Sequence, residues 1–202
     1  MTTSTAETDS PPVRRQRGRP RDPRVEGVVL DATRDLLLER GFGGLTIAAV
    51  ADAAGVGKGT IYLRWPDKES LVVAALAEVW EPVADPGTDS LRGDLLAITA
   101  AVANHFNGTA GQLFTSVIGE MTRYEALQRV WATSVVDSWD VVMMQVFARG
   151  VERGEMRDGI DLGVAINALL GPILSISAVR GETITRAQVE VFVDIFLRGV
   201  SA

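Results

Sequence analysis

The sequence predicts an all-helical protein with an N-terminal three-helix head and a C-terminal helical bundle, about nine helices in total. Apolar residues recur at spacings of three and four along most of the chain, which is the period of a helix with one buried face. No segment shows the convincing apolar–polar alternation of a strand. Because 47% of the 202 residues are hydrophobic and only 6% are aromatic, the core should be mainly aliphatic. We expect three regions: a basic arm over 1–22, the head over 23–70 and the bundle over 71–202.

The first 22 residues are rich in Thr, Ser, Pro and Arg and hold too few apolar residues to build a core. Five arginines fall within "RRQRGRPR", residues 14–21, although the net charge of the chain is −6. Residues 1–70 carry 11 basic and 10 acidic side chains, whereas residues 71–202 carry 9 and 16. This asymmetry indicates that only the front of the protein meets an anionic partner.

The head begins with a helix from Arg24, which Gly41 should end because glycine readily takes the left-handed conformation of a helix C-terminus. Thr46 is a suitable N-cap for the short helix "IAAVADAAG". A second short helix, "KGTIYLRW", starts near Lys58 after a glycine-containing turn and is closed by a proline. Asp67 then caps "KESLVVAALAEVW".

The rear of the chain is predicted to be helical as well. Asp161 should cap an uncharged helix of 18 residues, and Thr185 with Gln188 forms the pattern of a capping box for the last helix. The predicted rear helices cover residues 89–106, 110–121, 125–153, 162–179 and 186–200.

The uncharged segment 162–179 reaches the lower length limit for a membrane span. It contains Asn167, Gly171 and Pro172 and has no flanking aromatic belt, so we favour a helix buried between a core and a subunit interface. The start of the chain shows no apolar secretory segment, and the absence of cysteine excludes disulfides and thiolate sites. We therefore expect a cytoplasmic protein without a membrane partner.

Two short helices joined by a tight glycine-containing turn, and packed on a longer first helix, form the pattern of a helix-turn-helix. The second short helix is the one that would enter a major groove of DNA. Most of its expected exposed side chains are cationic or form hydrogen bonds: Lys58, Thr60, Tyr62, Leu63 and Arg64.

The segment "LTIAAVADAAGVGKGTIYLRWPDKESL" resembles the DNA-binding segment of the TetR family of transcriptional regulators. The similarity runs from about Val25 to Leu76 and is highly specific. The segment "VERGEMRDGIDLGVAINALLGPILSISAVRGE" is similar to the last helices of many family members. The resemblance implies an all-helical homodimer that binds DNA with its head and a small molecule with its bundle.

The resemblance also implies roles for residues of the head. Lys58 would contact a base or a phosphate, Tyr62 would contact a phosphate through its hydroxyl, and Thr46 and Lys68 would reach phosphates. Gly57 is a departure, because many relatives have a serine or a similar cap there. The full predicted DNA-binding set is Arg17, Gly18, Arg19, Thr46, Lys58, Gly59, Thr60, Tyr62, Leu63, Arg64 and Lys68.

Leu63 and Arg64 occupy variable reading positions, and Arg64 would bind either a guanine edge or a phosphate. Gly59 and Thr60 allow a close approach to the backbone. Residues 17–20, "RGRP", form the core of an AT-hook, which inserts arginine into a narrow A·T-rich minor groove. The alternatives are an arm that contacts phosphates without choosing a sequence and a solubilising tail.

A rival interpretation is that "GVGKGT", residues 55–60, ends a P-loop. A Walker A loop needs a strand before it, a glycine at position 52 and a Ser or Thr directly after the lysine. Asp52 and Gly59 stand at those positions, and residues 48–54 have a helical pattern. No catalytic constellation stands out, and His105 is the only histidine, so we expect neither an enzyme nor a metal site nor a cofactor.

Aromatic and methionine side chains of the bundle are candidates to line an effector pocket, with ordinary core packing as the alternative for each. These candidates are His105, Phe106, Phe114, Met121, Tyr124, Trp131, Trp139, Met143 and Met144.

Apolar residues surround most of the helix over 162–179, so one side can face the core while the other needs a partner. With the last helix it would form a four-helix interface between two copies, and Pro172 should kink it. The predicted interface residues are Leu162, Ile166, Leu169, Leu170, Ile173, Val189, Phe192, Val193 and Phe196.

The sequence therefore predicts a homodimeric, ligand-responsive transcriptional repressor that a small molecule releases from a palindromic operator in double-stranded DNA. The alternative is a helical effector-binding dimer whose head no longer binds DNA.

Overall fold

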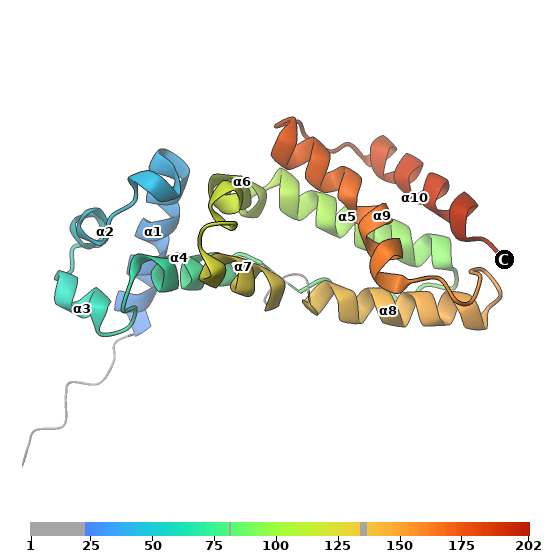
Figure 1. The fold of residues 1–202 in the computed structure, drawn as a ribbon, viewed down its shortest axis with the longest axis horizontal. Coiled ribbons are helices and arrows are strands. Elements are labelled where there is room, and N and C mark those ends of the chain that lie inside the picture. The colour runs from blue at the N-terminus through green and yellow to red at the C-terminus, as the bar shows by residue number, and fades with distance from the viewer. Residues whose placement is uncertain (1–22, 81, 134–136) are drawn as a thin grey trace, which may run out of the picture.

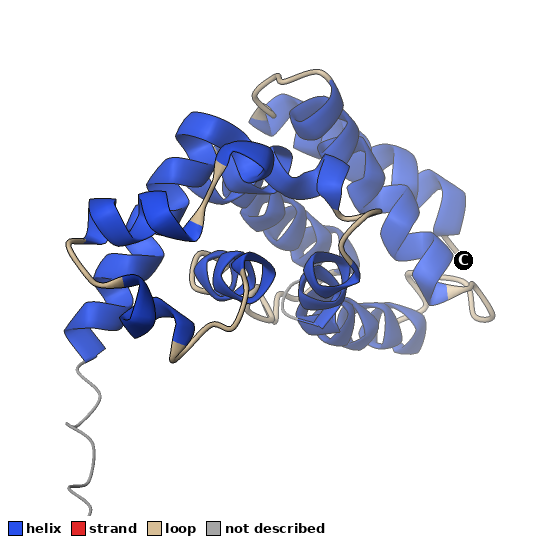
Figure 2. Ribbon diagram, turned by 60° about the vertical axis from the view of Figure 1, so that its left-hand side comes forward, coloured by secondary structure: helices blue, strands red, loops and turns tan. Residues whose placement is uncertain are grey.

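The computed structural model describes residues 23–80, 82–133 and 137–202, and over these residues every regular element is a helix (Figures 1 and 2). This confirms the predicted fold class. The segment 125–153, predicted as one helix, contains two: α7 (Glu125–Trp131) and α8 (Asp137–Glu152). The described residues therefore form ten α-helices rather than about nine.

The head holds α1 (Pro23–Gly44), α2 (Ile47–Ala54), α3 (Lys58–Tyr62) and α4 (Lys68–Ala77). Gly41 interrupts α1 with a left-handed φ of 66°, at the position where the sequence predicts its end. The Thr46 hydroxyl accepts a hydrogen bond from the Ala49 N–H at 3.1 Å, and the Asp67 carboxylate accepts one from the Ser70 N–H at 2.7 Å. Both predicted N-caps are confirmed, and they hold α2 and α4 in place around the short α3.

The body holds α5 (Leu91–Asn107), α6 (Thr109–Val117), α7, α8, α9 (Leu162–Leu174) and α10 (Arg186–Val200). A 3₁₀ turn, Ile118–Glu120, follows α6, and a π turn, Ser175–Val179, follows α9, whose interior contains Pro172. The Asp161 cap and the capping box at the start of α10 are confirmed. Figure 1 shows α1–α4 at one end of the molecule and the C-terminus at the other.

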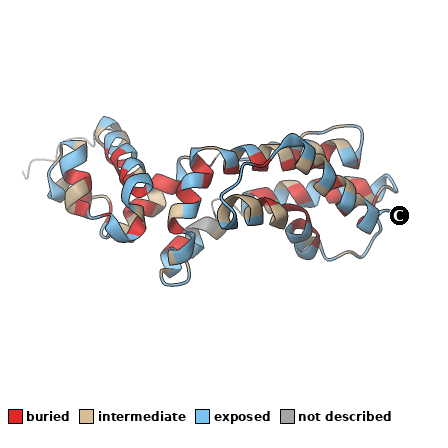
Figure 3. Cartoon of the chain, turned by 90° about the horizontal axis from the view of Figure 1, so that it is seen from above, coloured by how far each residue is buried: buried red, intermediate tan, exposed pale blue. Residues whose placement is uncertain are grey.

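The interior is divided into two hydrophobic cores, which Figure 3 shows as buried residues along the inner helix faces. The head core is built from α1–α4 and is completed by Leu113 and Val117 of α6 and Leu127 of α7. The body core joins α5, α8, α9 and α10. The predicted boundary after residue 70 falls inside α4; the cores instead meet at Val79 and Met121, which pack against both.

An ionic cluster fastens the segment between α4 and α5 to the end of α8. Asp94, whose side chain is 0% exposed, accepts hydrogen bonds from the N–H and hydroxyl of Thr88, both at 2.7 Å, and from Arg149 at 3.2 Å. Arg149 also donates two hydrogen bonds to Asp85, at 2.6 and 2.7 Å. These bonds lower the pKa of the Asp85 carboxyl below its usual range. The segment leaving the head is therefore tied to the body by charge-assisted hydrogen bonds.

Among the described residues, one helical stretch, Leu162–Val179, is long and apolar enough for a membrane span, with a mean hydropathy of 1.9. In the fold it packs against α5, α8 and α10. Its buried side chains include Leu169 and Ile173, neither of which has any exposed surface. One side of the helix thus serves as a core element of the body, as the sequence predicts, and the subunit interface on its other side stays a prediction.

Candidate nucleic-acid interface

The short helix α3 presents one face outward because the opposite face is anchored in the head core. Ile61 is fully buried, and helical geometry continues through Leu63, which is the C-cap. At about 100° per residue, Gly59 and Leu63 lie nearly opposite Ile61 and next to each other. Leu63 is 84% exposed, the highest value among the large hydrophobic side chains of the described residues.

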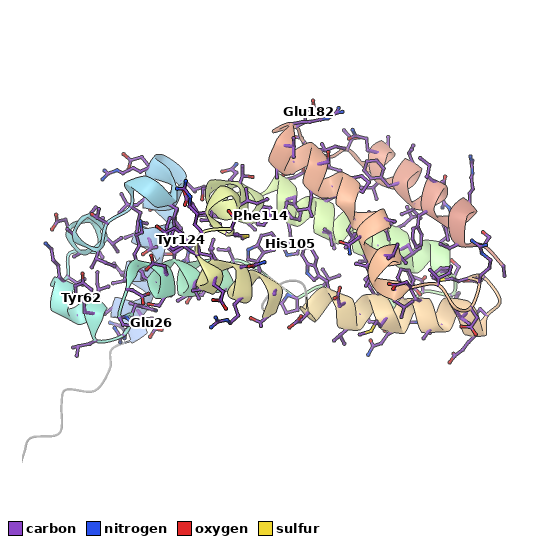
Figure 4. All side chains as sticks on the ribbon, in the orientation of Figure 1. Glu26, Tyr62, His105, Phe114, Tyr124 and Glu182 are labelled. Atoms are coloured by element: carbon purple, nitrogen blue, oxygen red, sulfur yellow. The ribbon has the colours of Figure 1, made fainter. Side chains whose placement is uncertain are left out.

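Cationic and hydrogen-bonding side chains flank this outward strip. Lys58 and Tyr62 lie on one side of it and are exposed, and Thr60 lies on the other and is half-buried. Figure 4 shows Tyr62 at the outer end of the head. Gly57 provides no side-chain cap, as the sequence predicts, so N–H groups at the start of α3 remain available to an acceptor.

Arg64 differs from its prediction as an exposed reading residue. Its side chain is only 14% exposed, and its Nε lies 3.7 Å from an oxygen of Glu26 at the start of α1. The physical reason is helical position: Arg64 follows Ile61 by three residues, so it is turned toward α1 rather than outward. Glu26 was not identified from the sequence as part of this surface.

Lys68, which the resemblance matches to a phosphate-clamping lysine, makes contacts within the head. Its Nζ donates a hydrogen bond to the Phe42 carbonyl at 2.9 Å and lies 4.0 Å from the centre of the Phe42 ring. The lysine thus holds the last turn of α1, after Gly41, against the start of α4 through a hydrogen bond and a cation–π contact. Thr46 is exposed, and its hydroxyl caps α2. Arg17, Gly18 and Arg19 of the predicted arm lie outside the described residues.

Comparison with known proteins agrees with this arrangement. The family model for bacterial regulatory proteins of the tetR family matches residues 29–75, and that for the tetracycline-repressor-like C-terminal domain matches residues 85–196. The chain belongs to the TetR family. It is therefore a DNA-binding transcriptional regulator rather than an enzyme, and TetR-family regulators typically dimerise and respond to small molecules.

Individual relatives cover nearly the whole chain. The uncharacterized HTH-type regulator YdeS of Bacillus subtilis is 28% identical over 188 residues, covering 93% of this chain and 95% of the relative. The uncharacterized HTH-type regulator Rv1556 of Mycobacterium tuberculosis is 32% identical over 181 residues, covering 87% and 89%. The crystal structure of the TetR-family regulator SCO0332 aligns with a TM-score of 0.62 at 27% identity, covering 88% and 99%.

The bundle of this TetR-family chain contains a cluster of aromatic side chains around Trp80. The Trp80 ring lies 5.5 Å from Phe106, 6.4 Å from Phe114 and 5.9 Å from Trp139, centre to centre, and stacks on His105 at 6.0 Å. Four predicted pocket residues therefore meet at one place, and Figure 4 shows His105 and Phe114 in the middle of the molecule. Trp80 itself was missed, because the sequence pattern assigned it to the end of α4.

The other pocket candidates are distributed differently. Met143 is buried in the body core, whereas Met144 is exposed. Met121 packs between the two cores, and Tyr124 packs on Phe42 of the head at 4.8 Å, away from the Trp80 cluster. The side chain of Trp131 lies outside the described residues. No group of three or more potential metal-ligating side chains occurs in the part of the chain that the structure describes.

An open pocket of about 560 Å³ borders the Trp80 cluster at His105. Glu78, on its rim, also forms an ion pair with Arg34 of α1 at 2.9 Å. The Arg34–Glu78 ion pair therefore connects this pocket in the body to the first helix of the head. Its lining residues are Glu78, Val79, Ala101, Asn104, His105, Gly108, Thr109 and Ala110.

Most of the predicted dimer-interface residues point into the chain's own core. Ile166, Leu169, Leu170, Ile173, Val189, Val193 and Phe196 are buried, because the sides of α9 and α10 that carry them pack on each other and on α5. Leu162 and Phe192 are half-buried. The apolar surface that these two helices leave exposed consists instead of Val164, Ala168, Val191 and Ile195.

Proposed function

We propose that this TetR-family regulator is a homodimeric repressor that binds a palindromic operator and releases it when a small molecule binds the body. The observation that carries the proposal is the α3 face: Lys58, Tyr62 and Leu63 are exposed on a helix whose opposite side is fixed by the buried Ile61. Such a rigid, partly cationic face suits a major groove. The family's typical cytoplasmic location, where its DNA is found, agrees with this role.

Dimerisation through α9 and α10 would place two α3 helices on one duplex. The exposed side chains Val164 and Ile195 are 65% and 63% exposed, and a groove of about 510 Å³ lies between the two helices beside them. The groove is lined mainly by apolar residues, including Pro172 and Phe192. An exposed apolar face of this kind is stabilised when a second copy covers it.

The effector would bind at the Trp80 cluster, reached from the pocket beside His105. Stacked and edge-on rings favour a ligand with a flat aromatic system, since such rings pack well on one another. A ligand that displaced Glu78 would also disturb its ion pair with Arg34 and, through it, α1. Effector binding would thereby shift the heads to a spacing that fits the operator poorly.

Selection of duplexes from a random pool by the purified full-length chain tests the DNA-binding part. We expect enrichment of an inverted repeat whose affinity falls at least tenfold in Lys58→Ala, the loss expected for one contact worth 1–3 kcal/mol in each half-site. Arg186→Ala removes an equally positive and exposed side chain from α10 and should leave the affinity unchanged. Failure to enrich any sequence would contradict the proposal.

The same duplex serves to test the effector. A panel of planar aromatic compounds should contain members that release it from the protein at micromolar concentration and that quench tryptophan fluorescence over the same range. Release without a fluorescence change would place the effector away from Trp80.

A further inference from the structure

The centre of the α3 face carries no hydrogen-bonding side chain. Gly59 and Leu63, four residues apart, form an adjacent pair directly opposite Ile61, while Lys58, Tyr62 and Thr60 lie to either side. The part of α3 that reaches deepest into a groove is therefore a glycine and a leucine. Lys58, Tyr62 and Thr60, on either side of this pair, would therefore make the hydrogen-bonding contacts, and they face the walls of the groove, which are lined by phosphates.

The surroundings of both residues favour close contact with base edges. A Cβ atom at Gly59 would have no neighbour within 4 Å, so the outer side of the α3 backbone is open at this point. Leu63 projects beside it and is 84% exposed. Single exposed hydrophobic residues are ordinary on protein surfaces, but this one stands at the centre of the surface that meets the partner.

The base edges in a major groove offer one prominent apolar group, the C5-methyl group of thymine. We propose that Leu63 reads a thymine methyl group in each half-site of the operator, with Gly59 allowing the approach. This inference rests on the proposed function, since it requires α3 to lie in a major groove. It assigns to this leucine a specific base, whereas the flanking residues supply orientation and affinity.

Replacement of thymine by deoxyuridine removes only the methyl group and therefore tests the contact directly. Each thymine of the selected duplex is replaced in turn, symmetrically in both half-sites, and the affinity is measured for the wild type, Leu63→Ala and Leu38→Ala. Leu38 is an exposed leucine of α1 that lines a pocket with residues of α6 rather than of α3, so it serves as the matched control. Because Leu63 is exposed, its truncation should leave the melting temperature unchanged.

For the wild type and Leu38→Ala we expect one thymine whose replacement weakens binding about fourfold per half-site, the loss that follows from one buried methyl group. Leu63→Ala should show no loss at that position. If the wild type binds the duplex and no thymine shows a loss that depends on Leu63, the inference is overturned while the proposed function stands. If the wild type binds no duplex at all, the proposed function itself fails.

Discussion

Lys58, at the start of α3, and Arg64, directly after its C-cap, are both cationic, but they have different surroundings. Lys58 is exposed at the start of α3. Arg64 is largely covered and lies near the Glu26 carboxylate. An arginine at the flank of the helix, beside α1, is placed to meet the DNA backbone rather than the base edges. Binding to a phosphate would exchange one anionic partner, Glu26, for another.

Arg64→Ala should therefore weaken binding to every duplex by a similar factor. The slope of log affinity against log salt concentration should become shallower by about 1 for each protomer, because one phosphate contact is lost. Glu26→Gln should have the opposite effect and strengthen binding to all duplexes at low salt. Fluorescence anisotropy titrations on the operator and on an unrelated duplex measure both changes.

The control for the second variant is Glu39→Gln, which removes an exposed acid near the other end of α1. It should change the affinity less than Glu26→Gln does. A loss confined to the operator in Arg64→Ala would contradict this account and would show that Arg64 reads a base.

At the scale of single residues, the sequence predicted the hydrogen bonds of those side chains whose partners are close in the chain. The caps Thr46 and Asp67 each bond to a backbone N–H three residues ahead, so the local pattern contains the whole interaction. The contacts of Arg64 with Glu26 and of Lys68 with Phe42 were not foreseen, because these partners come from distant positions in the chain. The spacing of apolar residues in the sequence indicated that Ile61 is buried. The outward direction of Leu63, two residues later on the opposite side of α3, follows from this.

Among the elements, the segment between α4 and α5 shows how the head is attached to the body. Asp94 is buried at the start of α5 and is compensated by Arg149, by Arg153 at 3.8 Å and by Thr88. A buried carboxylate is tolerated only with such partners. The pKa of Arg149 is raised by its hydrogen bonds to Asp85 and Asp94, so the guanidinium stays charged throughout the accessible pH range.

Arg149→Ala should lower the free energy of unfolding, because it leaves the buried Asp94 carboxylate with only Arg153 and Thr88 as partners. Urea denaturation followed by circular dichroism measures the change. Arg129→Ala, which breaks the exposed pair with Glu125, should cost less than about 0.5 kcal/mol. Equal losses in the two variants would contradict a structural role for the cluster.

Helix lengths were less predictable than helix positions. The patterns of α3 and α4 were expected to continue to Trp65 and Trp80, but α3 ends at Tyr62 and α4 at Ala77. Both tryptophans turn into a core after their helix ends, and this tertiary packing overrides the local helical pattern. The aromatic cluster around Trp80 was consequently only partly foreseen.

In the whole molecule, α3 lies at one end of the fold and α10 with the C-terminus lies at the other (Figure 1). The two ends are connected by Val79 and Met121, which pack on both cores, and by the Arg34–Glu78 ion pair. In the proposed repressor, these contacts would couple an effector bound in the body to α1. The spacing of apolar residues in α9 and α10 predicted that these helices form an interface. It did not predict which face of each helix is left exposed for that interface, because packing on α5 determines which residues are buried.

Ile195→Glu should convert the dimer into a monomer, because it places a charge on the exposed apolar face of α10. Affinity for the palindrome should fall at least a hundredfold as the second head is lost. Sedimentation velocity measures the first effect and anisotropy the second. Ile118→Glu makes the same change at another exposed isoleucine, on the turn after α6, and should leave both unchanged. A monomeric wild type would refute the proposed interface.

The central claim is that α3 lies in the major groove twice on one duplex. Methylation of guanine N7 by dimethyl sulfate reports on this groove directly, with the wild-type protein bound to its selected duplex. We predict protection of guanines in two segments whose centres are about 10 base pairs apart or a multiple of that spacing, related by the symmetry of the site. Unprotected guanines throughout a duplex that is otherwise bound, or protection in a single segment, would contradict the account.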